Sequence, residues 1–407
     1  MNIHTFTLPN GIRFVHCYHT SPVAYCGLSI NAGSRDEKAA ENGMAHLAEH
    51  MLFKGTTRRS AYHINNRLEN VGGELNAFTT KEETVVHAIV LKSDLDKAVE
   101  LLADIVFRST FPDRELAKEK EVIADEINSY LDNPSELIFD DFDKWLFAGS
   151  SLGRPILGTP DSLADITAAQ LKTFVSRHYR PSQLVFSTVA SVNAKRMEQL
   201  AVKYFSEFPA AGVRRERKAP SVCRPFQKIL RRNTFQEHCI IGNRAYSLHD
   251  PRRTGLALLV NYLGGPAANS RLNSLLREKN GLVYTTDATY MPYDDCGTVT
   301  LYFAADRVSL NRCAELVQKE LTAICTNAFG TAQLHRIKKQ WLGQLFINAD
   351  NAEVQMLSNG KNVMSYGYVE SFEQLKAKID ALTAAELLDI ANEIFAPERL
   401  STLIYTS

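Results

Sequence analysis

The chain contains the segment Asn42-Gly-Met-Ala-His46-Leu-Ala-Glu49-His50-Met-Leu-Phe53. This segment is rich in Ala, Leu, Met, Glu and His and contains no Pro, so it predicts a helix. Residues four apart share one face of a helix, so His46 and His50 can offer two imidazole nitrogens to one metal ion. Glu49 flanks the same face and can act there as a base toward water. The H-x-x-E-H spacing therefore predicts a metal site with a general base beside it.

Two histidines leave such a site incomplete, because catalytic zinc sites usually have three protein ligands and one open position. A charged amphipathic helix is predicted over residues 113–132. Glu119 and Glu126 lie about two turns apart on it and point the same way. One of them can bind the metal while the other orients a ligand. Taken alone, however, this helix is typical of a solvated face with core contacts.

The segment from Gly43 to Thr56 resembles the signature of the pitrilysin-type M16 metallopeptidases. In length the chain is most similar to their processing-peptidase-like M16B subfamily. The resemblance implies that His46, His50 and Glu126 bind one Zn²⁺ ion per chain. It also implies that Glu49 is the general base and that Glu119 supports the site.

A second segment, Gly72-Gly-Glu-Leu-Asn76-Ala77-Phe78-Thr79, resembles the edge strand of that family. The main chain of that strand pairs with an extended substrate, so the resemblance assigns Asn76, Ala77 and Phe78 to peptide binding. A strand edge can hold peptides of almost any sequence through backbone hydrogen bonds. By itself the segment predicts only an ordinary strand after a Gly-Gly turn.

A third segment, from Ser270 to Tyr284, resembles the R-E-x-x-G-L-x-Y element of the family. The resemblance implies that Arg277 and Tyr284 help to bind substrate near the scissile carbonyl. A guanidinium and a phenol can both donate hydrogen bonds to a carbonyl or a developing oxyanion. As an isolated piece, the segment predicts only a helix that ends at Gly281.

The chain also contains an internal repeat with an offset of about 215 residues. Residues 95–101 correspond to 310–316, and 167–171 correspond to 383–387. A constant spacing of this size predicts a duplicated domain. We expect a zinc-bearing domain over 1–208, a linker over 209–225 and a homologous substrate-binding domain over 226–407. The repeat positions of the His and Glu ligands fall near residues 261–265 and 341, where the second copy has no metal ligands.

The pattern of strands and helices in each half predicts an α+β fold. Strands are expected over 6–8, 12–18, 25–30, 84–91 and 184–190, and helices over 94–108, 113–132 and 167–179. Each half is expected to be a mostly antiparallel sheet with helices on one face. The resemblance further implies that the two halves face a central cavity.

The composition excludes several classes of partner. The 407 residues include 46 basic and 46 acidic side chains, so nothing predicts binding to nucleic acid or to an anionic membrane. The N-terminal segment has no charged and apolar regions typical of a secretory peptide. Seven scattered cysteines suggest free thiols in a reducing compartment. We therefore expect a cytoplasmic protein.

The resemblance implies a zinc metalloendopeptidase that hydrolyses extended or unfolded peptides inside an enclosed chamber. The alternatives are a peptidase that processes one leader or precursor, and a subunit of a hetero-oligomeric peptidase complex. The expected partners are peptide substrates and a second copy of the chain. In such a homodimer the first domain of one chain would meet the second domain of the other. A heterodimer with a related subunit is the alternative assembly.

Overall fold

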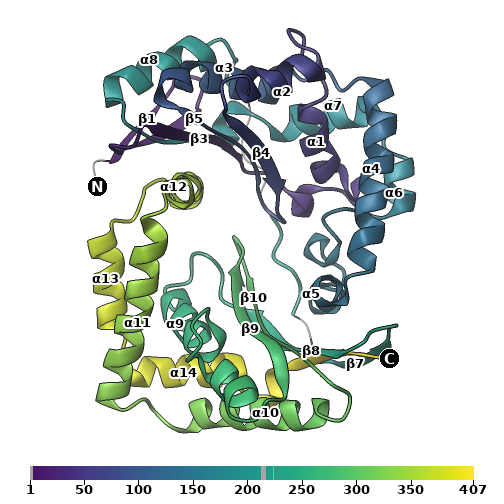
Figure 1. The fold of residues 1–407 in the computed structure, drawn as a ribbon, viewed down its shortest axis with the longest axis vertical. Coiled ribbons are helices and arrows are strands. Elements are labelled where there is room, and N and C mark those ends of the chain that lie inside the picture. The colour runs from purple at the N-terminus through teal and green to yellow at the C-terminus, as the bar shows by residue number, and fades with distance from the viewer. Residues whose placement is uncertain (1–2, 212–216, 223) are drawn as a thin grey trace. The chain divides into compact units, whose positions relative to one another are not determined.

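A computed structural model describes residues 3–211, 217–222 and 224–407 of the chain, and the predicted linker lies partly outside these ranges. The described residues form two sheets and many helices, so the predicted α+β class is confirmed (Figure 1). They separate into two compact units, each containing one sheet. None of the helices described is long and apolar enough to cross a membrane.

The first unit is built on a six-stranded sheet with the order β1-β2-β6-β3-β5-β4. β2 and β6 pair in parallel, and the other neighbours pair antiparallel. The strands are β1 (Ile3–Thr7), β2 (Arg13–Tyr18), β3 (Val23–Ile30), β4 (Glu74–Thr79), β5 (Thr84–Leu91) and β6 (Leu184–Ala190). The predicted strands over 84–91 and 184–190 thus have the bounds expected from the sequence.

The second unit has a five-stranded sheet with the order β7-β11-β8-β10-β9. Its strands are β7 (Gln227–Arg231), β8 (Glu237–Ala245), β9 (Val283–Pro292), β10 (Gly297–Ala305) and β11 (Ser401–Thr406). Here β7 and β11 form the parallel pair. This order repeats that of β2-β6-β3-β5-β4 in the first sheet, so the internal repeat seen in the sequence is also a repeat of topology.

Helices cover both sheets. Those of the first unit are α1 (Met44–Leu52), α2 (Ala61–Glu69), α3 (Leu95–Arg108), most of α4 (Asp113–Leu131), α6 (Pro160–Ala164), α7 (Ala168–His178), α8 (Ala194–Phe205) and α12 (Ala352–Tyr366). Those of the second are α5 (Pro134–Leu146), α9 (Arg253–Gly264), α10 (Leu310–Thr326), most of α11 (Thr331–Ala349), α13 (Phe372–Ala381) and α14 (Ala384–Phe395). A short π-helical segment, Asn273–Glu278, precedes β9.

Each half of the sequence contributes one segment to the unit formed mainly by the other half. Ser129–Gly153, which contains α5, belongs to the second unit, and Ile347–Ser371, which contains α12, belongs to the first. The starts of the two helices lie 218 residues apart, close to the spacing of the repeat. Equivalent helices are therefore exchanged between the halves. The predicted domains over 1–208 and 226–407 stay a prediction.

In the first unit, α12 covers the face of the sheet opposite α3 and α8 (Figure 1). Alternate strand residues point to opposite faces. Phe14, Leu28 and Phe186 join the main core beneath the helices, whereas Val15 and Val185 pack with residues of α12. A single helix thus covers the face of the sheet that the other helices leave open.

The contact between α12 and the sheet includes a polar pair in which the histidine is buried, and this pair predicts that stability depends on pH. His87 of β5 lies 3.1 Å from Glu353 of α12. Burial lowers the pKa of His87 below its ordinary value of 6.5, although Glu353 opposes this effect. At pH values near and below about 6.5, the unfolded chain therefore binds more protons than the folded protein. The stability contributed by neutral His87 is present above this pH and is lost as the pH falls.

We expect the urea midpoint of the wild-type protein to fall between pH 7.5 and pH 5.5. His87→Gln should show a weaker dependence because Gln does not titrate. Unfolding curves of both proteins at three pH values measure this difference. If the urea midpoints of the two proteins fall equally with pH, His87 does not contribute to the pH dependence of stability.

Candidate metal centre

α1 is an almost completely buried helix whose start is fixed by its surroundings. Gly43, at its N-cap, has a φ of 90°, and a Cβ there would lie 2.8 Å from the carbonyl oxygen of Leu157. Glycine alone meets both demands comfortably. The buried carboxylate of Glu37 accepts hydrogen bonds from the backbone N–H groups of Gly43 (3.1 Å) and Ala45 (2.8 Å). These contacts satisfy free donors in the first turn of the helix.

Three side chains converge beside α1. His46 and His50 of α1 and Glu126 of α4 offer ligand atoms that all lie within 4.8 Å of one another. The Nε2 atoms of His46 and His50 lie 3.2 and 3.8 Å from Oε2 of Glu126. The Glu126 side chain is 44% exposed, so one side of the cluster is open to solvent. The structure thus brings together the three residues predicted as metal ligands.

This donor set fits a zinc ion. A tetrahedral Zn²⁺ with bonds of about 2.0–2.1 Å holds its donor atoms about 3.3 Å apart. The separations of 3.2 and 3.8 Å agree with that value after small side-chain movements. Two imidazoles and one carboxylate also match the ligand types of catalytic zinc sites and leave one position open.

The orientation of His50 is set by two further residues. Its Nδ1 lies 3.0 Å from Oε2 of buried Glu119, and Oε1 of Glu119 lies 2.7 Å from Nζ of Lys54. A carboxylate at Nδ1 directs the other ring nitrogen toward a metal and raises its basicity. Lys54 was missed by sequence reasoning, although it lies four residues after His50. Because Lys54 lies two residues beyond the end of α1, helix spacing does not place it beside His50, and the sequence carried no signal for this contact.

Glu49, the predicted base, lies next to the cluster in a largely buried position. Its Oε2 accepts a hydrogen bond of 2.5 Å from the hydroxyl of Thr79 and lies 3.7 Å from Nδ1 of His46. Burial opposes protonation of His46, but the carboxylates of Glu49 and Glu126 outweigh it, so the pKa of His46 is raised. A proton on His46 competes with a metal ion, because metal ligands must be deprotonated.

The three predicted peptide-binding residues lie on β4, at one edge of the first sheet. β4 pairs with β5 on one side, so its other backbone edge is open within the described part of the sheet. Leu75 and Ala77 pack against the core, and the ring of Phe78 meets that of His87 on the opposite face. Asn76, Ala77 and Phe78 therefore stand on a strand that can accept an extended peptide.

Arg277 and Tyr284 belong to the second unit. Arg277 lies near the end of the π-helical segment, 3.9 Å from its neighbour Glu278. Tyr284 stands near the start of edge strand β9, and its side chain is 81% exposed. Both side chains are thus accessible in their own unit. Their role in substrate binding stays a prediction.

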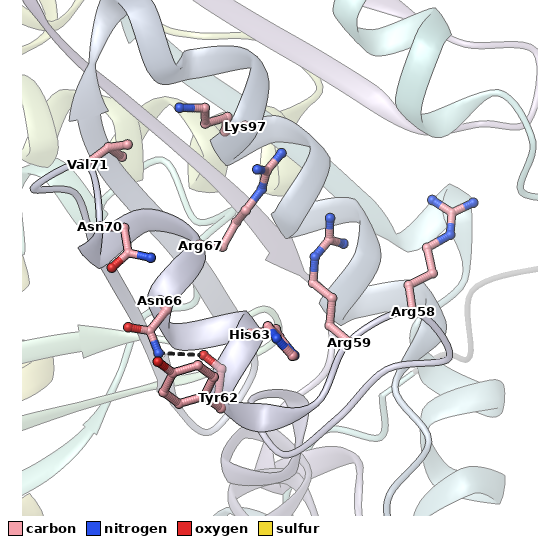
Figure 2. Close-up of a pocket in the computed structure, with 9 residues that line it drawn as sticks. All are labelled: Arg58, Arg59, Tyr62, His63, Asn66, Arg67, Asn70, Val71 and Lys97. Carbon is pink, nitrogen blue, oxygen red and sulfur yellow. Dashed lines mark hydrogen bonds between the residues drawn. The ribbon is translucent and has the colours of Figure 1, made fainter.

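A hollow of about 540 Å³ lies elsewhere in the first unit, against α2 and α3 (Figure 2). Its cationic lining consists of Arg58, Arg59, Arg67 and Lys97. Arg59 binds Glu100 at 2.8 Å and Asp104 at 2.7 Å on α3. Ion pairs thus hold this region against α3, and none of the residues predicted for the metal centre lines the hollow.

Comparison with known families agrees with this geometry. Residues 14–160 match the family described as Insulinase (Peptidase family M16), and residues 165–341 match the Peptidase M16 inactive domain. The protein named "Uncharacterized zinc protease YmxG" of Bacillus subtilis is 31% identical over 100% of this chain and 98% of its own. The chain belongs to peptidase family M16. The resemblance noted in the sequence is thereby confirmed, and zinc is the metal that the M16 relatives imply.

Other M16 relatives and solved structures extend the comparison. A Streptomyces coelicolor protein, also named an uncharacterized zinc protease, is 30% identical over 95% of this chain and 86% of its own. The crystal structure of a Helicobacter pylori protease superposes with a TM-score of 0.92 at 20% identity and covers 100% of this chain and 99% of that one. A Pseudomonas fluorescens structure titled as a peptidase M16 inactive domain gives a TM-score of 0.91 at 21% identity, covering 100% and 98%. These likenesses establish the two-unit M16 fold.

Proposed function

We propose that this M16 chain is a zinc-dependent endopeptidase that hydrolyses extended or unfolded peptides. The observation that carries the proposal is the convergence of His46, His50 and Glu126 beside the buried carboxylate of Glu49. A structural metal site, which only stabilises the fold, needs neither a neighbouring base nor a side open to solvent. The open edge of β4 supplies a surface for a peptide of almost any sequence.

The chemistry follows from these residues. When bound by His46, His50 and Glu126, zinc supplies a Lewis acid that lowers the pKa of water to about 7 and polarises a carbonyl. The Glu49 carboxylate accepts a proton from water as the water oxygen bonds to the scissile carbonyl carbon. It then gives that proton to the amine nitrogen as the C–N bond breaks. Glu119 holds His50 in its binding orientation throughout.

The purified protein should contain about one zinc per chain and should cleave a mixed library of unfolded peptides. Cleavage should stop when a chelator is added, and folded proteins should be spared. His50→Ala and Glu126→Ala should lose both zinc and cleavage, because each removes a ligand. Metal analysis and mass spectrometry of the library measure these outcomes.

The same experiment separates the alternative functions. Cleavage of one precursor at one site, with the library untouched, would favour a processing peptidase. A zinc-loaded protein that cleaves only after a related subunit is added would favour the hetero-oligomeric complex. A protein that binds no zinc would overturn the proposal.

We further propose a homodimer in which Arg277 and Tyr284 of one chain serve the metal centre of the other. The test mixes a Glu49→Gln chain with an Arg277→Ala/Tyr284→Phe chain, each nearly inactive alone. A mixed dimer then has one site with both lesions and one intact site, so activity should recover toward half of the wild-type value. No recovery after verified subunit exchange would contradict shared sites.

A further inference from the structure

Thr79 connects the predicted peptide-binding strand to the predicted base. It is the last residue of β4, and its hydroxyl oxygen lies 2.5 Å from Oε2 of Glu49 on α1. We propose that Thr79 is a positioning residue that sets the orientation of the Glu49 carboxylate. This inference rests on the proposed peptidase function, in which Glu49 handles the proton.

The direction of this hydrogen bond follows from counting protons. A threonine hydroxyl has one proton to donate. The hydroxyl of Thr84, which lies 3.4 Å from that of Thr79, donates its proton to the carbonyl oxygen of Ala32 at 2.9 Å. The proton of Thr79 is therefore directed to Glu49. A hydrogen bond to an ionised carboxylate is shorter and stronger than one between neutral groups.

The bond also distinguishes the two oxygens of the Glu49 carboxylate. Oε2 accepts the hydrogen bond from Thr79 and faces Nδ1 of His46 at 3.7 Å. Within the described residues, Oε1 has no hydrogen-bond partner. Thr79 thus assigns Oε1 as the oxygen that receives the proton from water. Without the Thr79 hydroxyl, the Glu49 carboxylate can rotate, and Oε1 is no longer held as the oxygen that faces the water.

The location of Thr79 links substrate binding to this orientation. Leu75, Ala77 and Thr79 alternate onto the helix side of β4, where α1 packs, while the backbone edge of the strand stays open. A peptide that pairs with this edge restrains the strand that carries Thr79. Binding energy from residues remote from the scissile bond can thereby raise turnover. We expect kcat to rise with peptide length.

The test compares wild type, Thr79→Val and Thr79→Ser on peptides of increasing length that share one scissile bond. Thr79→Val keeps the β-branched shape suited to a strand but removes the hydroxyl. On the longest peptide it should lower kcat about 10- to 100-fold while KM and zinc content stay near wild type. The rise of kcat with length should also disappear. Thr79→Ser restores the donor and should recover most of the activity.

Thr80→Val is the matched control. The Thr80 hydroxyl bonds within the β4–β5 turn, to the carbonyl oxygen of Glu83 at 3.2 Å. If the changes act only through this turn, both valine variants will lose activity alike, and the positioning role is overturned. The positioning role is also overturned if Thr79→Val retains wild-type kcat, or if Thr79→Ser gives no rescue. A wild-type enzyme that cleaves no peptide overturns the proposed function itself, whatever the variants do.

Discussion

Glu49→Gln is expected to retain zinc and to lose turnover by about 10²–10⁴-fold. Gln has nearly the size and shape of Glu, and its amide oxygen can still accept the hydrogen bond from Thr79. The amide cannot take a proton from water, however, so the step in which hydroxide is generated loses its base. The three predicted ligands are untouched, which separates this variant from His50→Ala.

The measurement is kcat on an unfolded peptide together with zinc content per chain. Thr79→Ser serves as the control for a small polar change next to the same carboxylate. Wild-type turnover in a zinc-loaded Glu49→Gln protein would show that Glu49 is not the base. Loss of zinc would instead indicate that Glu49 holds the site together.

Removal of α12 is expected to abolish stable folding of the first unit. A chain that ends at residue 211 contains all six strands of the first sheet but lacks the helix that covers one face. Val15, Val185 and Val189 would lose their partners on α12 and become exposed to water. Loss of several buried side chains at about 1.5–3 kcal/mol each is comparable to the whole stability of a domain.

Because α12 packs closely on the sheet, other parts of the chain cannot easily replace the contacts that its removal would break. A Cβ at Gly360 would lie 2.9 Å from the hydroxyl of Ser29 and 3.1 Å from that of Ser187. The fragment 1–211 should therefore aggregate or lack cooperative unfolding. Co-expression with residues 212–407 supplies α12 on a separate chain and should restore a folded complex. A fragment 1–211 that unfolds cooperatively at the wild-type midpoint would contradict this role of α12.

Local features of the candidate metal centre were predictable from the sequence because they depend on helix geometry. The i, i+4 spacing of His46 and His50 requires only that the segment be helical, and α1 is. Glu119 and Glu126 likewise share one side of α4 because they lie about two turns apart. The strands were predictable from runs of β-branched and apolar residues, as in β5 and β6.

Contacts between elements were less predictable. Thr79 reaches Glu49 only because the edge strand packs beside α1, and no spacing along the chain encodes that contact. The exchange of α5 and α12 was missed for a similar reason. Periodicity shows that a helix has an apolar face, but it does not specify which sheet that face will cover. The repeat identifies the two helices as counterparts without indicating that they change places.

The late position of α12 in the chain has a consequence for biosynthesis. The ribosome completes β6 at Ala190, whereas α12 begins only at Ala352. At about 5–20 residues per second, some 160 residues take roughly 10–30 s to add. During that interval the nascent chain already carries His46, His50 and Glu126, but its first sheet still exposes an apolar face. The first unit can therefore complete its fold only after α12 has been added, and until then the nascent chain depends most on chaperones to shield that face.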